Sequence, residues 1–399
     1  MQRQRFLFAI TSHGFGHMTR TLEIAREFVA LFPEVEAVIS TKLPRGRVER
    51  ELTVPFIFRS QDYEPGTAQK NCFEVDVDGT LRAYREHVRE RSYRIRKEEE
   101  FLKEIGCSGI VSDIPALPVR CASRLGIPAV GVSNFTWDWI LAPLLEGTDL
   151  EDLPRQLAED YRFGQLHLRL PFGPSVSPFP VVEPAPLVGR KAKIGPADVK
   201  RRLGLPDDTR RLVVVCPGGW GAEQWPPISV AGCEEYRFVL VGDLPVSLNA
   251  PVLRLPADLP ERLGFADLVG AADIVLSKPG YGIASECVVN RTPMVGIERH
   301  GFREAAELVK GLKEAGPFTE LSLDDFFDGR WEKALHEIEA SEVNWQRTPG
   351  GDSHGDNSHG GARQVAARLG SFFQLDGTRD SGPVSPATFT ERGSYESPS

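Results

Sequence analysis

Residues 5–32 read RFLFAITSHGFGHMTRTLEIAREFVALF, and the order of residue types along this stretch decides the fold. A continuous apolar run ends in the loop SHGFGH, and the segment after the loop places apolar residues at the spacing of an amphipathic helix. The pattern predicts a strand, a tight loop and a helix, which together form the repeating unit of a parallel sheet.

The same alternation recurs along the rest of the chain. In the first half we expect buried strands at 36–42, 55–60, 109–114 and 127–135, and a long charged helix at Thr80–Ile105. A second series follows, with strands at 211–219, 236–243, 274–280 and 293–298 and helices at 195–205, 266–273, 303–314, 323–340 and 362–373.

Prolines are dense in LPFGPSVSPFPVVEPAPLVGR at 170–190, and such a segment can continue neither a helix nor a central strand. We therefore predict an α/β chain of two doubly wound, Rossmann-like domains that face a cleft. The first domain is expected at 1–172, a proline-rich linker at 173–192 and the second domain at 193–375. The tail at 376–399 is rich in Ser, Pro, Thr and Gly and is expected to be disordered.

Composition narrows the classes of function. The chain has 399 residues, 41% of them hydrophobic, which is enough for two cores, and its formal net charge of -9 disfavours nucleic acid as the main partner. No apolar run approaches the roughly 20 residues of a membrane span, and the run at 6–10 is too short for a signal peptide, so a cytoplasmic protein is expected. The six cysteines form no CxxC pair, and we expect reduced core residues and no metal site.

Open parallel sheets bind ligands in the loops that follow their strands. The first such loop contains His13 and His17, and a neutral imidazole there could remove a proton from a hydroxyl group. Phe15 and Gly16 of the same loop are candidate contacts for the molecule that carries this hydroxyl. The alternative is that one histidine only caps the helix. The glycine spacing departs from GxGxxG, so a nicotinamide cofactor is not expected.

Asp113 ends another predicted strand of the first domain. An aspartate at this position could orient an imidazole from the first loop and stabilise its protonated form. It could equally cap the helix that follows, since aspartate is a favoured N-cap residue.

The candidate residues for binding a nucleotide-activated donor lie in loops after the strands of the second domain. They are Gly218, Gly219, Lys278, Gly280, Tyr281, Gly282, Ser285, Glu286 and Glu304. Glycines expose backbone amides, and a helix N-terminus favours phosphate oxygens. Glu286 has the reach to accept hydrogen bonds from ribose hydroxyls. The alternative is that the glycines serve helix packing and Glu286 is a surface residue.

Aromatic residues cluster after the strand at 127–135. Trp137, together with Phe135 and Trp139, is a candidate for an acceptor pocket, and the preceding Asn134 is a candidate polar contact. Aromatic residues at this spacing also commonly belong to a core.

Several of these segments resemble a known family. GHMTR at 16–20 and ADIVLSKPGYGIASECVVNRTPMVGIER at 272–299 resemble the acceptor loop and the donor-binding segment of the GT-B glycosyltransferases, which include the UDP-glycosyltransferases and MurG. A closer resemblance is to the N-terminal glycosyltransferase-like domain of plant arabinokinases, on 111–140, 178–191 and 278–286. No Gly-rich phosphate loop of the GHMP kinases is found, so sugar phosphorylation is not implied.

The resemblance implies an inverting, metal-independent glycosyltransferase that uses a nucleotide-diphosphate sugar, most often a UDP-sugar, and a hydroxyl acceptor. It makes His17 the position of the acceptor-activating base and Asp113 its partner, and it gives donor contacts to Gly280, Gly282, Ser285 and Glu286. Two alternatives stay open: a module that binds a nucleotide sugar without turnover, and an epimerase that acts on the nucleotide sugar alone.

Overall fold

The first domain is built on a sheet of seven parallel strands. The computed structural model describes residues 3–218, 224–257, 259, 263–341, 344–345 and 360–375. The sheet has the order β3-β2-β1-β4-β5-β6-β7, and the last five residues of β1 and of β4 are all buried, as expected of central strands covered on both faces. The strands are β1 (Gln4–Ile10), β2 (Val35–Thr41), β3 (Phe56–Ser60), β4 (Cys107–Asp113), β5 (Ala129–Ser133), β6 (Leu166–Arg169) and β7 (Val182–Pro184).

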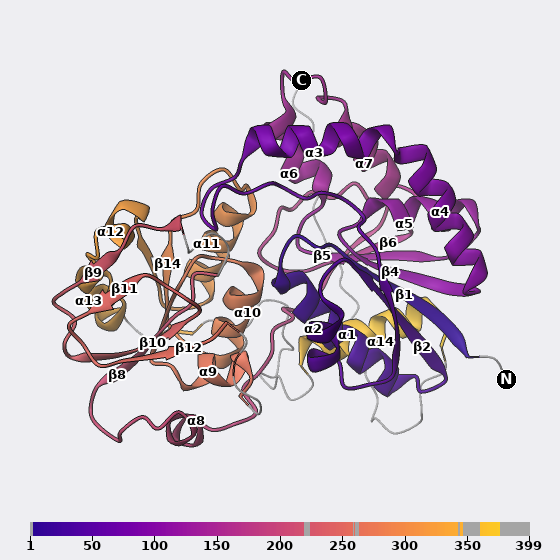
Figure 1. Ribbon diagram of the computed structural model, residues 1–399. Coiled ribbons are helices and arrows are strands. Elements are labelled where there is room, and N and C mark those ends of the chain that lie inside the picture. Colours follow the sequence, from indigo (N-terminus) through magenta and orange to yellow (C-terminus); the bar gives the residue numbers. More distant parts are fainter. Residues whose placement is uncertain are drawn as a thin grey trace, which may run out of the picture.

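Helices follow most of these strands (Figure 1). They are α1 (Phe15–Leu31), α2 (Arg45–Glu51), α3 (Val77–Arg89), α4 (Arg91–Glu104), α5 (Ala116–Arg124), α6 (Trp137–Leu145) and α7 (Leu153–Tyr161). The single long helix predicted at Thr80–Ile105 is wrong, because the chain turns at Glu90 and forms α3 and α4. Tyr84 of α3 packs with Trp137, whereas α4 packs into a different apolar cluster, so the turn lets each half reach its own core.

The second domain repeats the design with a parallel sheet of order β12-β10-β8-β13-β14-β15. Its strands are β8 (Arg211–Val215), β10 (Tyr236–Val241), β12 (Val252–Leu255), β13 (Ile274–Ser277), β14 (Met294–Ile297) and β15 (Phe318–Leu321), and a small separate sheet contains β9 (Ile228–Val230) and β11 (Val246–Leu248). Its helices are α8 (Pro196–Arg202), α9 (Phe265–Ala271), α10 (Tyr281–Asn290), α11 (Glu304–Ala315), α12 (Leu323–Phe327) and α13 (Glu332–Ala340). The predicted fold class of two doubly wound α/β domains is confirmed.

The described chain differs from the predicted domain boundaries in two places. β7 lies within the predicted linker 173–192 and pairs with β6 at the edge of the first sheet, where proline is tolerated. The last described helix, α14 (Gly361–Phe372), lies in the sequence range predicted for the second domain but packs along α1 of the first (Figure 1). Phe373, directly after α14, contacts the ring of Phe6. Burial of this aromatic surface holds the end of the described chain against the first domain. The predicted disordered tail at 376–399 lies outside the described residues.

A loop of the first domain reaches into the core of the second. Phe73, between β3 and α3, is fully buried and stacks on Trp225 with ring centroids 5.3 Å apart. Its backbone oxygen accepts a hydrogen bond of 2.9 Å from the amide of His300. The two domains are therefore joined by this loop as well as by the linker and α14.

Candidate functional site

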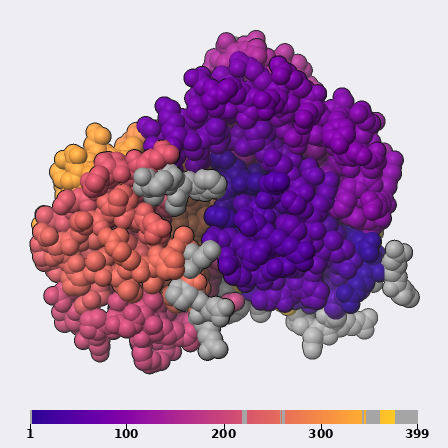
Figure 2. All heavy atoms as spheres, in the orientation of Figure 1, coloured from indigo at the N-terminus to yellow at the C-terminus, as the bar shows by residue number. Residues whose placement is uncertain are grey.

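The carboxyl ends of the two sheets face each other across a cavity of about 1920 Å³ (Figure 2 shows the two domains meeting along a furrow). Of the predicted site residues that the structure describes, those that line it are His13, Phe15, Gly16, His17, Gly218, Lys278, Gly280, Tyr281, Gly282, Glu286 and Glu304. Asp113, Asn134, Trp137 and Ser285 do not line it, and Gly219 lies outside the described residues.

The first turns of α1 and α10 are in contact across this cavity. Each helix starts after a glycine, Gly14 and Gly280, that supplies no capping side chain, so backbone amides are left to other partners. A Cβ atom on Gly16 would lie 3.0 Å from the backbone nitrogen of Gly282. Glycine is required here because any side chain would separate the two helices. Two positive helix ends therefore meet at one place.

His17 is held by Asp113, as the sequence predicted. Its Nδ1 lies 3.1 Å from Asp113 Oδ1, and the residues are 7% and 1% exposed. Asp113 is not an N-cap, because α5 starts at Ala116 and Pro115 occupies the cap position. The aspartate instead ends β4 beside the first turn of α1.

Arg20 completes this group, and the sequence analysis missed it. Its Nε and Nη2 donate to the two carboxylate oxygens of Asp113 over 2.6 and 2.5 Å. Burial alone would raise the pKa of Asp113, but the charge and hydrogen bonds of Arg20 hold that pKa well below its usual range. The signal was available, since position 20 follows His17 by three residues and lies on the same helix face.

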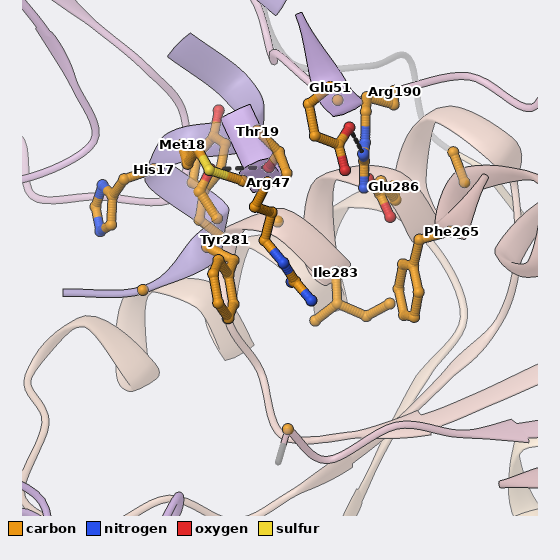
Figure 3. A pocket seen from close by; sticks show the side chains of 18 of the residues that line it. His17, Met18, Thr19, Arg47, Glu51, Arg190, Phe265, Tyr281, Ile283 and Glu286 are labelled. Carbon is orange, nitrogen blue, oxygen red and sulfur yellow. Dashed lines mark hydrogen bonds and ion pairs between the residues drawn. The ribbon is translucent and has the colours of Figure 1, made fainter. Parts of the chain in front are cut away.

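The contacts of His17 depend on its tautomer. Arg20 Nη2 also lies 2.9 Å from Nδ1, and it can donate only to an unprotonated nitrogen. A proton on Nδ1 is instead donated to Asp113 and leaves Nε2 with a free electron pair. No described residue forms a hydrogen bond with Nε2, and Figure 3 shows the ring at one end of the cavity.

A polar chain continues from Arg20 into the second domain. Arg20 Nη1 donates to Asn134 Oδ1 over 2.7 Å, and Asn134 Nδ2 donates to Glu304 Oε1 over 2.8 Å. The Arg20 guanidinium also lies 4.3 Å from the ring centroid of Tyr281. Asn134, a predicted acceptor contact, is 1% exposed and serves this connection.

The predicted aromatic acceptor pocket is not formed by Trp137. This side chain is 1% exposed, lies in a core cluster with Phe135, and donates from Nε1 to Glu64 over 3.0 Å. The aromatic residues that do line the cavity in the described chain include Phe15 and Phe302. Sequence spacing could not separate the two groups, because both follow strands.

His13 and Glu64 lie on the same side of the cavity. The His13 ring packs 5.3 Å from the ring of Phe302, and its Nε2 lies 3.2 Å from Thr67 Oγ1. Burial and, second, the charge of Arg299 lower the pKa of His13 well below its ordinary value, so the ring is neutral. Burial raises the pKa of Glu64 to about 7, which makes it a second group able to exchange protons near neutral pH. Glu64 follows β3, a position that could have identified it.

On the second-domain side, Lys278 Nζ donates to the carbonyl oxygen of Cys72 over 2.9 Å. Burial, followed by the charge of Arg299, lowers the pKa of Lys278 to about 8. Ser285 faces its own helix, since its Oγ donates to the Gly282 carbonyl over 2.9 Å.

Glu286 is already paired. Its Oε1 accepts from Arg190 Nε over 2.6 Å, and Arg190 Nη1 contacts Glu51 Oε2 over 2.6 Å. Figure 3 shows this group of three at the end of the cavity away from His17. Burial raises the pKa of Glu286 despite the arginine. A ribose would have to share the carboxylate with Arg190.

Within the described ranges, no group of three or more His, Cys, Asp and Glu side chains is placed to hold a metal ion. His354 and His359, in the sequence TPGGDSHGDNSHGG at 348–361, lie outside these ranges. None of the described helices is long and apolar enough to cross a membrane.

No family model matches the chain. It is 29% identical over 335 residues to L-arabinokinase of Arabidopsis thaliana. The match covers 82% of this chain and 31% of that protein, so the chain spans about a third of the relative's length. It is 24% identical over 251 residues to an uncharacterized glycosyltransferase of Methanopyrus kandleri, covering 57% of this chain and 69% of that one.

Solved structures match over nearly the whole chain. The glycotransferase of kitacinnamycin superposes with a TM-score of 0.61 at 14% identity, covering 94% of this chain and 100% of that one. Phytolacca americana UGT2, crystallised with UDP-2fluoro-glucose and pterostilbene, superposes with a TM-score of 0.57 at 13% identity over 93% and 100% of the two chains. The resemblance found in the sequence is therefore confirmed, and the chain has the two-domain GT-B fold of the glycosyltransferases.

Proposed function

We propose that this chain transfers a sugar from a nucleotide-diphosphate sugar to a hydroxyl acceptor. One observation carries the proposal: His17, held by Asp113 at the end of the first sheet, lies at the cavity where the first turns of α1 and α10 meet. A base can take the proton of the attacking hydroxyl. Two uncapped helix N-termini beside it can stabilise the departing diphosphate.

In the proposed step, the acceptor hydroxyl lies against His17 Nε2 and the anomeric carbon of the donor lies beyond it. The acceptor oxygen forms a bond to this carbon while the bond to the phosphate oxygen breaks, and the nucleoside diphosphate leaves with the electron pair. The hydroxyl proton passes to Nε2, and Asp113 stabilises the imidazolium through Nδ1. Attack from the face opposite the leaving group inverts the anomeric configuration.

The second domain would bind the donor. Backbone amides at Gly218 and Gly280 and the ammonium of Lys278 line the cavity together, and they would stabilise the charge that develops on the diphosphate. With positive charge supplied by these groups, the proposed step includes no metal ion. UDP-sugars are the first donors to test.

The alternative is a module that binds a nucleotide sugar without turnover, and the Arg190 pair would affect donor binding in either case. Because Glu286 is held by Arg190, a bound ribose has to compete with an ion pair inside the protein. This alternative predicts nucleotide binding that is independent of His17 and no release or transfer of the sugar in the native chain.

The test starts with calorimetric titration of UDP, GDP, dTDP and their sugars into the purified protein. Release or transfer of the sugar is then measured for the native chain and for His17→Ala, and proton NMR gives the anomeric configuration of the product. We expect His17→Ala to keep nucleotide affinity and to lose roughly 100- to 10,000-fold in rate. His336→Ala is the matched control, since this exposed histidine pairs with Glu235 on the second domain, away from the cavity. Equal rates for native chain and His17→Ala would remove the catalytic proposal, and retention of configuration would remove the single displacement.

A further inference from the structure

Arg299 presents to the cavity a positive charge that no described residue pairs. It follows β14 and lines the cavity, and its guanidinium lies 4.1 Å from the ring centroid of Phe302. None of the described residues accepts a hydrogen bond from this guanidinium or forms an ion pair with it, unlike the arginines of the first-domain side. Arg299 is half-buried, and a guanidinium that is partly removed from water normally finds a carboxylate or another acceptor.

Lys278 adds a second cation beside it. Its only hydrogen bond to a described residue goes to the neutral carbonyl of Cys72. The one carboxylate that acts on both cations is Glu304, and one of its oxygens already accepts from Asn134. Burial lowers the pKa of Arg299, as expected of a cation without a paired anion. Among the described residues, these two neighbouring cations thus share one carboxylate, in a protein whose net charge is -9.

The position of Arg299 separates it from the loops proposed to hold the diphosphate. In the order β8-β13-β14, Gly218 follows β8 and Gly280 follows β13, while Arg299 follows β14 on the far side. The Phe302 ring beneath Arg299 packs 5.3 Å from the ring of His13, in the loop that leads into α1 and His17. The unpaired charge therefore lies toward the acceptor-side loop.

We infer that Arg299 binds an anionic group on the transferred sugar or on the acceptor, a carboxylate or a phosphate monoester distinct from the donor diphosphate. The inference rests on the proposed function, because that function places the donor diphosphate at the loops of Gly218 and Gly280. Arginine suits this role because its planar fork can donate two parallel hydrogen bonds to such a group. The chain would therefore select an acidic sugar substrate over the neutral sugar of the same shape.

The experiment has two arms that separate the two sources of the anion. In the donor arm, UDP, UDP-glucose and UDP-glucuronate are titrated calorimetrically into the native chain. In the acceptor arm, glucose, glucuronate and glucose 6-phosphate are titrated with and without saturating UDP, and ligand-observed NMR detects weak binding. Both arms are repeated with Arg299→Gln, with Arg299→Lys, and with Arg303→Gln as the matched control. Arg303 is exposed, contacts Trp139 and does not line the cavity.

We expect the acidic ligand of one arm to bind about tenfold to a hundredfold more tightly than its neutral counterpart, as charged hydrogen bonds typically give. Arg299→Gln should abolish this preference and leave the affinity for UDP unchanged, Arg299→Lys should keep part of it, and Arg303→Gln should keep all of it. The inference is overturned if neither arm shows a preference for the acidic ligand, or if this preference survives Arg299→Gln. It is also overturned if Arg299→Gln lowers the affinity for UDP as much as the affinity for UDP-glucuronate. Failure of UDP to bind would contradict the proposed function instead, and the acids titrated without UDP would still decide the role of Arg299.

Discussion

The charged groups around Asp113 in the first domain and around Arg299 in the second domain are paired in opposite ways. On the first-domain side, Asp113 accepts from Arg20, Thr21 and His17, so its charge is fully met within the protein. On the second-domain side, Lys278 reaches only a carbonyl, and Arg299 has no hydrogen-bond or ion-pair partner among the described residues.

The difference separates positioning from binding. A buried ion pair with good geometry fixes the place and the tautomer of a neighbouring group. Cations without a paired anion cost stability in the empty protein, and such a cost is typical of ligand sites. The first-domain side therefore has the features of a preformed catalytic group, and the second-domain side has those of a site completed by its ligand.

The strongest test of this difference is to make the same substitution, arginine to glutamine, on both sides of the cavity. Arg20→Gln leaves Asp113 buried without its cation, and we expect the free energy of unfolding to fall by about 3–5 kcal/mol. Arg299→Gln removes no ion pair, only a contact with the Phe302 ring, and we expect a change below about 1 kcal/mol. Urea denaturation at pH 7 measures both. Equal losses for the two variants would show that the two arginines have equivalent surroundings.

A second, smaller effect concerns Lys278, whose pKa burial lowers to about 8. Below this pH the ammonium is charged in both the folded and unfolded states, and the folded chain bears the full cost of the buried charge. Between pH 8 and the pKa of an unfolded lysine near 10.4, only the unfolded state binds the proton, so stability rises with pH.

Lys278→Met should therefore be more stable than the native chain at pH 7, by on the order of 2 kcal/mol, and the advantage should shrink as the pH rises through 8 to 10. The same variant should bind UDP more weakly. Thermal denaturation across pH 6–10, with UDP titrations at pH 7, checks both parts. A variant less stable than the native chain at pH 7 would show that Lys278 has a structural role.

The first-domain side was the easier one to predict from sequence. The strand, loop and helix at 5–32 placed His17 at a strand end, and Asp113 at the end of β4 became its partner because adjacent parallel strands end side by side. Arg20 lies one turn after His17 on the same helix face, but its role becomes clear only with its partner Asp113, which lies 93 residues away in the chain.

Contacts between the domains could not be obtained from local patterns. Asn134 and Trp137 were assigned to an acceptor pocket, but the docking of α11 and the burial of Glu64 turn both side chains inward. Glu286 was expected to be free for a ribose, and its partner Arg190 comes from the linker. Residue type and spacing therefore located the site, whereas the partners of each charged group came from tertiary packing.

The smallest expected effect concerns Ser285, predicted from the sequence as a donor contact on the second-domain side. Its Oγ donates to the Gly282 carbonyl inside α10 and the residue is 2% exposed, so it has no access to the cavity. Ser285→Ala should lower the free energy of unfolding by no more than about 1 kcal/mol, the usual net value of one hydrogen bond, and leave UDP affinity unchanged. Urea denaturation and calorimetric titration beside Lys278→Met measure both quantities. A tenfold loss of UDP affinity in Ser285→Ala would mean that α10 rotates when the nucleotide binds, and the second-domain side would then be rearranged by its ligand as well as completed by it.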